Sequence, residues 1–186
     1  MKKAKKIPVS LIRKFCRRKG TGRDDLQNIL ICGPYVYATD AAIAIRLPIK
    51  YVSFRSDDIA FDFPGFDFPT LFQKIDEQLG SGSNIKPDIR LPKIKPRLCR
   101  CRGKLKLDAE SDECKYITDG GETCLHGLVF DKSIVLGGQY VAPKYIHLIN
   151  QLPSVRMQPA PSCDKPFLFT FLKGAGVGAL MPRRCA

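Results

Sequence analysis

Side chains that can bind a metal gather in one part of the chain, between Cys99 and His126. Cys99 and Cys101 are separated by one residue, and Cys114, Cys124 and His126 follow. Four thiolates, or three thiolates with the imidazole, form a ligand set that holds zinc in tetrahedral geometry. Such an ion would organise a loop that is too short to bury a core of its own. The first pair is Cys-x-Cys rather than the usual Cys-x-x-Cys, so zinc, unligated thiols and a disulfide are all open at this point.

The N-terminal residues indicate the cellular compartment, and therefore the redox environment, of these thiols. The chain starts with several lysines, but Arg13 and Lys14 interrupt the apolar part that follows, which does not fit a signal peptide. We therefore expect a cytoplasmic location, where thiols stay reduced or bind metal. No apolar run reaches the roughly 18 residues of a membrane span, so no membrane partner is expected. The other four of the eight cysteines are expected to be core residues (Cys16, Cys32) or loop and tail residues (Cys163, Cys185).

Charge is the second chemical signal in the sequence. The chain has 31 lysines and arginines against 18 aspartates and glutamates, a formal net charge of +13. This imbalance favours a polyanionic partner, nucleic acid ahead of membrane, with an ordinary basic surface as the alternative. No P-loop, Gly-x-Ser-x-Gly motif or helix-opening Gly-x-Gly-x-x-Gly motif is present. We therefore expect a non-enzymatic binding protein.

Two segments concentrate the positive charge. The first lies near the N-terminus, where Ser10 is predicted to N-cap a helix over residues 11–19. Its apolar residues, Ile12, Phe15 and Cys16, share one side at helical spacing. The opposite side would present Arg13, Lys14, Arg17 and Arg18 to a phosphate backbone or to solvent.

The second basic segment covers residues 85–106, and Asp88 is its only acid. Its repeated prolines predict an extended connection rather than a helix. An extended basic arm could follow a phosphate backbone, whose contacts supply affinity that depends on salt. We take Arg97 and Arg100 as its candidate DNA contacts.

The elements around these segments form two similar halves. In the first half, short strands are expected near 29–31, 35–37 and 42–47, with turns at Gly33-Pro34 and Thr39-Asp40. In the second half, a strand at 134–136 ends at Gly137-Gly138, and residues 139–141 continue the chain to a helix over 143–151. Strands follow near 155–158, 166–172 and 177–181. A short helix is expected over 70–79. The sequence thus predicts an α+β fold of two helix-plus-antiparallel-meander repeats with an irregular insertion between them.

Several segments resemble a known family. Residues 35–40, Tyr-Val-Tyr-Ala-Thr-Asp, and the apolar strand after them look like the "ATD" turn of sliding clamps, the β processivity factors of bacterial DNA polymerase III. Residues 144–149, 166–171 and 179–184 are similar, in the same order, to the helix and strands that end the last clamp domain. The resemblance covers the two repeats, a little over half of the chain.

The resemblance implies a DNA-clamp-like fold and a DNA-binding protein of replication or repair, of phage or mobile-element origin. Residues 1–186 would form a single clamp-like domain, with repeats at 7–50 and 134–184 and an insertion at 51–133. Clamp helices line the DNA, which points to the basic face of the first helix and to Lys144 on the second, with His147 and Asn150 as weaker candidates. A ring needs six such domains, so the resemblance also implies a homo-oligomer and replication proteins as partners. The alternative is a zinc-stabilised module for binding a protein or RNA.

Overall fold

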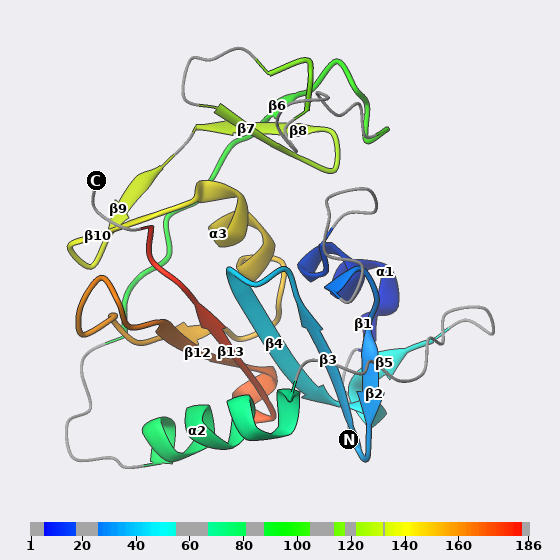
Figure 1. Ribbon diagram of the computed structural model, residues 1–186, viewed down its shortest axis with the longest axis vertical. Helices are drawn as coiled ribbons and strands as arrows, with labels where there is room; N and C mark the ends of the chain where they lie inside the picture. Colours follow the sequence, from blue (N-terminus) through cyan, green and yellow to red (C-terminus); the bar gives the residue numbers. More distant parts are fainter. Residues whose placement is uncertain are drawn as a thin grey trace.

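The computed structural model describes residues 6–17, 26–54, 67–80, 88–104, 114–117, 122–131 and 133–183. Its central element is a six-stranded antiparallel sheet (Figure 1). The two meanders meet where β13 pairs with β4, with Leu180 opposite Ile43. Helices and antiparallel sheets together confirm the predicted α+β class. In sheet order the strands are β11 (Arg156–Met157), β12 (Phe167–Phe171), β13 (Gly176–Leu180), β4 (Ile43–Pro48), β3 (Tyr35–Thr39) and β2 (Leu30–Cys32).

Glycines form the tight turns of both halves. Gly33 adopts φ +55 between β2 and β3, a left-handed conformation that glycine takes at little cost. In the second half, β9 (Ile134–Leu136) and β10 (Gln139–Val141) form a hairpin. Its two turn residues, Gly137 and Gly138, have φ +53 and +82, as a two-residue hairpin turn requires. The predicted strand at 134–136 and its end at Gly137-Gly138 are confirmed, and the structure pairs this strand with β10.

The Thr39-Asp40 segment ties the two halves together. The buried Thr39 hydroxyl donates a 2.7 Å hydrogen bond to the Ile43 carbonyl, which closes the turn between β3 and β4. The Asp40 carboxylate accepts from the backbone N–H groups of Ala42 and Ile43, each at 3.0 Å. It also accepts a 2.6 Å hydrogen bond from the Tyr145 hydroxyl in the second half. Burial, followed by the Asp40 charge, raises the pKa of Tyr145, so its phenol stays protonated and donates.

Helical segments of both halves pack on one face of the sheet. They are α1 (Val9–Ile12), η1 (Arg13–Phe15) and α3 (Pro143–Ile149). Alternate strand residues point toward them, so that Val36 and Ala38 belong to this core while Tyr37 belongs to the cluster on the opposite face. Pro143 begins α3, as predicted, because a first-turn proline loses no helical hydrogen bond.

The first helix differs from the prediction. It begins at Val9 rather than after Ser10, its N-cap is Pro8, and no side chain caps it. The chain continues as η1, and Cys16, at φ −83 and ψ 158, ends it in extended backbone. The expected continuation to residue 19 is therefore wrong at Cys16, since the Cys16 backbone is no longer helical and its thiol is buried in the core. Arg18 lies outside the described residues.

A longer helix, α2 (Phe68–Gly80), covers the other face of the sheet. Phe68, Phe72 and Ile75 are buried there against residues of β3, β12 and β13. Arg46 of β4 lies 4.7 Å from the ring centroid of Tyr35 and donates two 2.9 Å hydrogen bonds to Asp76. The predicted helix over 70–79 is confirmed, and it starts two residues earlier. The sheet is therefore enclosed by helices on both faces.

The remaining elements are a second, smaller sheet and several short strands and helical turns. A three-stranded antiparallel sheet in the order β6-β8-β7 lies beyond α3, at the end of the molecule away from α2 (Figure 1). Its strands are β6 (Arg97–Leu98), β7 (Glu122–Leu125) and β8 (Leu128–Asp131), and Leu125 and Phe130 are part of the main core. Among the described residues, no helix is long and apolar enough to cross a membrane. The short elements are β1 (Ile7–Pro8), paired in parallel with β5 (Val52–Ser53), together with η3 (Ile49–Tyr51) and η4 (Leu172–Gly174).

Candidate metal centre

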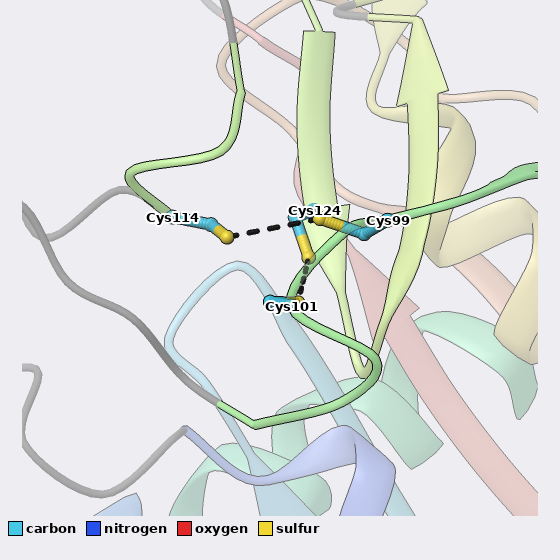
Figure 2. A group of neighbouring side chains, drawn as sticks. All are labelled: Cys99, Cys101, Cys114 and Cys124. Carbon is cyan, nitrogen blue, oxygen red and sulfur yellow. Dashed lines mark hydrogen bonds between the residues drawn. The ribbon is translucent and has the colours of Figure 1, made fainter.

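Four cysteines meet beside the small sheet (Figure 2). The Sγ atoms of Cys99, Cys101, Cys114 and Cys124 all lie within 4.8 Å of one another. The Sγ atoms of Cys99 and Cys114 are 3.8 Å apart, and those of Cys101 and Cys124 are 3.5 Å apart. Thiolates at about 2.3 Å from a tetrahedral zinc lie about 3.8 Å from one another. Two of the sulfur pairs thus have about the spacing of a tetrahedral site, and the four thiols lie close enough together to hold a metal ion.

The first two cysteines lie on a turn that follows β6. The Arg102 N–H donates to the Cys99 carbonyl at 3.0 Å, and the Lys104 N–H donates to the Cys101 carbonyl at 2.8 Å. Arg102 and Gly103 have φ +47 and +83, so the chain reverses directly after Cys101. Both thiols lie near Cys124, although only one residue separates Cys99 from Cys101 (Figure 2).

Cys124 lies on β7, two residues before a tight hairpin turn. His126 and Gly127 form this turn at φ +50 and +85, the pair of left-handed residues that a two-residue hairpin favours. The Cys99 N–H donates a 2.7 Å hydrogen bond to the Gly127 carbonyl. A Cβ on Gly127 would lie only 2.4 Å from the backbone nitrogen of Gly103. The hairpin turn is therefore fastened to the cysteine turn by close backbone contact.

Cys114 completes the cluster from a separate segment. Its carbonyl accepts a 2.8 Å hydrogen bond from the Ile117 N–H, which forms a second short turn. The side chains of Val129 and Ile117 pack against the cysteines, and Cys99, Cys101 and Cys114 are no more than 4% exposed. This small cluster is separate from the two larger cores. A bound ion would join its three backbone segments, which apolar contacts alone join weakly.

The environment shifts the pKa values of the two thiols on the cysteine turn in opposite directions. Burial raises the pKa of the Cys99 thiol above its usual value. Burial also acts to raise the pKa of Cys101, but hydrogen bonds from the Gly103 backbone and from the other three thiols outweigh it, so this pKa is lowered. A thiolate is the form that binds metal. The exposed cations Arg100, Arg102 and Lys104 lie on the same turn and oppose the negative charge of a tetrathiolate site.

His126, the alternative ligand considered from the sequence, lies outside the thiol cluster. It is exposed at the tip of the β7–β8 hairpin, where it lines a hollow together with Arg13 and Lys14. The structure thus brings together the four cysteines and assigns the imidazole to a different surface.

The candidate DNA contacts fall into two groups around α3. Arg13 is exposed and Lys14 half-buried on η1, and Arg17 follows, with its N–H bonded to the Leu26 carbonyl at 2.8 Å. Arg97 forms an ion pair with Glu122 across the small sheet, and Arg100 is exposed on the cysteine turn. Lys144 is half-buried, with its Nζ 4.9 Å from the Tyr145 ring centroid.

The basic arm, residues 88–96, covers part of α3 that the clamp resemblance would leave for DNA. Asn150 donates a 2.9 Å hydrogen bond to the Pro92 carbonyl. The ring centroids of His147 and Phe130 are 5.3 Å apart. Burial, then the charge of Lys14, lowers the pKa of His147, while a hydrogen bond to the Ile94 backbone opposes this shift. His147 and Asn150 therefore contact the arm and the small sheet.

The apolar side chains of the arm pack on the rest of the protein. The prediction of an extended basic arm does not include this packing. The side chains of Ile89, Leu91 and Ile94 pack against the main core, and the Ile89 N–H bonds to the Met157 carbonyl at 2.8 Å. The sequence holds a signal for this packing, because apolar residues alternate roughly with basic ones along the arm, as in a half-buried strand. All seven lysines and arginines from 88 to 104 are exposed: Arg90, Lys93, Lys95, Arg97, Arg100, Arg102 and Lys104.

Three of the remaining cysteines can be compared with their predictions. Cys163 is exposed in the loop between β11 and β12, as expected, and Cys185 lies outside the described residues. Cys16 is buried, as expected, and burial raises the pKa of its thiol to about 12. The prediction for Cys32 is wrong, because this thiol is exposed at the end of the edge strand β2.

Comparisons of the chain with protein-family models, with curated proteins and with solved structures found no match.

Proposed function

We propose that this protein binds DNA, without enzymatic activity of its own, through the basic arm and the cysteine turn that follows it. One observation carries the proposal. The segment from 88 to 104 exposes all seven of its lysines and arginines, while Ile89, Leu91 and Ile94 anchor it to the core. An anchored, extended row of cations suits a phosphate backbone because little ordering entropy is lost when it binds.

The acidic residues near this row do not cancel it. Asp88, the only acid between 88 and 104, accepts a 2.7 Å hydrogen bond from Arg156. Glu122 is paired with Arg97, so this arginine contributes less to a phosphate contact than its neighbours do. The cations at 90, 93, 95, 100, 102 and 104 then carry most of the proposed interaction.

The test is the salt dependence of DNA binding. The triple variant Arg90→Gln, Lys93→Gln, Lys95→Gln removes three exposed cations from the arm. Each lost phosphate contact lowers the slope of log K against log salt by about 0.9, so the slope should fall by up to about 2.7. A matched control is the triple variant Lys74→Gln, Lys165→Gln, Lys173→Gln, which removes three exposed lysines away from the arm. An unchanged slope in the triple variant would remove the arm from the proposal.

Zinc is the metal that we propose for the cysteine centre. The support is a set of four close thiols, three of them buried, in which two sulfur pairs have about the spacing of a tetrahedral site. Elemental analysis of the purified protein should find one zinc per chain. If the folded protein is reduced, incubated with zinc and still takes up none, the zinc proposal is wrong and the four thiols are unligated.

We also propose a clamp-like fold for the two repeats. The two meanders joined along β13 and β4, with helices of both halves on one face, are compatible with the plan that the sequence resemblance implies. Because the arm covers part of α3, DNA would contact the arm in addition to the η1 residues Arg13 and Lys14. A ring would require further copies of the chain, and replication proteins would be its partners. Light scattering with and without DNA tests this part: a hexamer supports a ring, and a monomer bound to DNA excludes it.

A second candidate is a zinc-stabilised module that binds RNA. It is favoured by two exposed apolar side chains beside the cysteine centre, Leu98 at 87% exposure and Tyr116 at 40%. Exposed aromatic side chains among cations stack on unpaired bases. Binding of duplex DNA, single-stranded DNA and RNA of one sequence and length separates the two candidates. A preference for RNA that is lost in Tyr116→Ala would favour the second.

A further inference from the structure

A basic hollow separates the first helical segment from the β7–β8 hairpin, apart from the thiol cluster. It has a volume of about 540 Å³. Ser10, Arg13 and Lys14 line one side, Ser53 lies at the β1–β5 pair, and His126 faces them from the hairpin tip. No carboxylate is among the described residues that line it. We call this site the basic hollow.

The walls of the basic hollow are held by backbone structure. Ser10, Arg13 and Lys14 are three and four residues apart, so they share one side of the α1–η1 segment. Ser53 is fixed by the parallel pairing of Pro8 with Ser53. The opposite wall, His126, belongs to the turn whose next residue packs directly on the cysteine turn. A rigid site therefore offers donors from three separate elements.

The chemistry of the lining selects for an anion. A guanidinium, an ammonium, two hydroxyls and an imidazole all supply hydrogen-bond donors, and two of these groups are permanently charged. Arginine and lysine together are the usual partners of phosphate. A phosphomonoester carries a charge of about −1.5 to −2 at neutral pH, more than the single charge of a backbone diester. The volume is within the range of about 300–1,000 Å³ typical of small-molecule sites, which leaves room for more than a lone phosphate.

We propose that the basic hollow binds the phosphomonoester of a nucleotide, either at the end of a nucleic acid strand or in a free nucleoside monophosphate. The strand-end form rests on the proposed DNA binding, in which the arm holds the backbone and the hollow receives the terminal phosphate. The free-nucleotide form does not depend on it.

The first experiment compares ends on one oligonucleotide. Binding is measured by fluorescence anisotropy with a 5′-phosphate, a 3′-phosphate or hydroxyls at both ends, with the label placed internally. We expect one phosphorylated end to bind about tenfold more tightly than the hydroxyl form, as for a charge-assisted contact. Nucleoside monophosphate should compete, and the matching nucleoside should not.

The second experiment locates the site with two variants. Lys14→Gln removes a charge, and His126→Asn removes the imidazole while keeping a residue that suits a left-handed hairpin turn. Each should abolish most of the preference for the phosphorylated end. His126→Asn should leave the binding of the hydroxyl form within about twofold, whereas Lys14→Gln should also weaken it, because Lys14 is among the proposed DNA contacts. Lys74→Gln on α2 is the control and should change neither. Circular dichroism spectra and zinc content show that each variant is folded.

Each outcome decides the proposal. A preference that disappears in both site variants supports a strand end, and nucleotide binding without any end preference supports the free nucleotide. Equal affinity for all ends, with no competition by nucleoside monophosphate, overturns the inference but leaves the proposed DNA binding intact. A preference that survives in both variants also overturns it, since the phosphate then binds elsewhere. If no DNA binds, the proposed function fails, and titration of nucleoside monophosphate, followed by NMR at residue 126, tests the hollow alone.

Discussion

Replacing Gly127 by alanine tests how the β7–β8 hairpin and the cysteine turn depend on each other. A Cβ at this position would lie 2.4 Å from the Gly103 nitrogen and 3.0 Å from the Arg102 carbonyl carbon. Both neighbours are backbone atoms, so no side-chain rotation can relieve the contact. Gly127 also has φ +85, which disfavours alanine. The substitution therefore combines backbone strain with a steric clash inside the metal centre.

Gly138 provides the matched control. Its φ is +82, and a Cβ there would have nothing within 4 Å. Gly138→Ala should therefore show the backbone strain alone, about 1–2 kcal/mol. Gly127→Ala should add an overpacking cost of about 1–3 kcal/mol, for a total of about 2–5 kcal/mol in the free energy of unfolding. Urea unfolding of the zinc-loaded proteins measures both values.

The clash should also weaken metal binding, because it pushes the turn of Cys99 and Cys101 away from Cys124. If about 1–3 kcal/mol of strain is carried by the bound geometry, zinc affinity falls by about 5- to 150-fold. Competition with a chromophoric chelator measures this, and Gly138→Ala should leave the affinity unchanged. If the two variants are equally destabilised, or if Gly127→Ala binds zinc as tightly as the unchanged protein, then the hairpin turn and the cysteine turn are not coupled through the Gly127–Gly103 contact.

Three further predictions concern single side chains. Cys114→Ser should lower zinc content well below one per chain and expose the protein to proteolysis near the centre, because Cys114 is the ligand that its segment supplies to the cluster; full zinc retention would exclude it as a ligand. The pKa of His147 is lowered in the folded state, so the neutral form is favoured there, and stability should decrease as pH falls below about 6.5, its usual value. Urea midpoints between pH 7.5 and 5 should show this loss, and His147→Gln should reduce it. In folded protein, iodoacetamide should label the exposed Cys32 and Cys163 within minutes and spare Cys16, whose thiol is buried with a pKa of about 12; equal labelling rates would contradict the packing of the first helix.

Much of the local structure could be predicted from the residues because turns and caps are local. Gly33-Pro34 and Gly137-Gly138 mark hairpin turns, and Pro143 marks a helix start, each through its own backbone preference. The predicted start of the first helix is too late because serine is a common N-cap, whereas the helix begins at Val9, directly after Pro8. The extended backbone of Pro8 pairs with Ser53 of β5. That pairing is a contact with a residue more than forty positions away, and it has no local signal.

The cysteine centre shows most clearly what is local and what is not. Ligand types, basic surroundings and the glycines that allow tight turns can all be read from the chain, because they are properties of individual residues and their neighbours. The folded chain alone establishes that Cys99 meets Cys114 across 15 positions and Cys101 meets Cys124 across 23, with His126 outside the cluster. The pairing of β6 and β7 with β8, and the contact of Gly127 with Gly103, place these side chains together. Such placement depends on strand register and backbone packing between distant segments, which residue spacing along the chain does not contain.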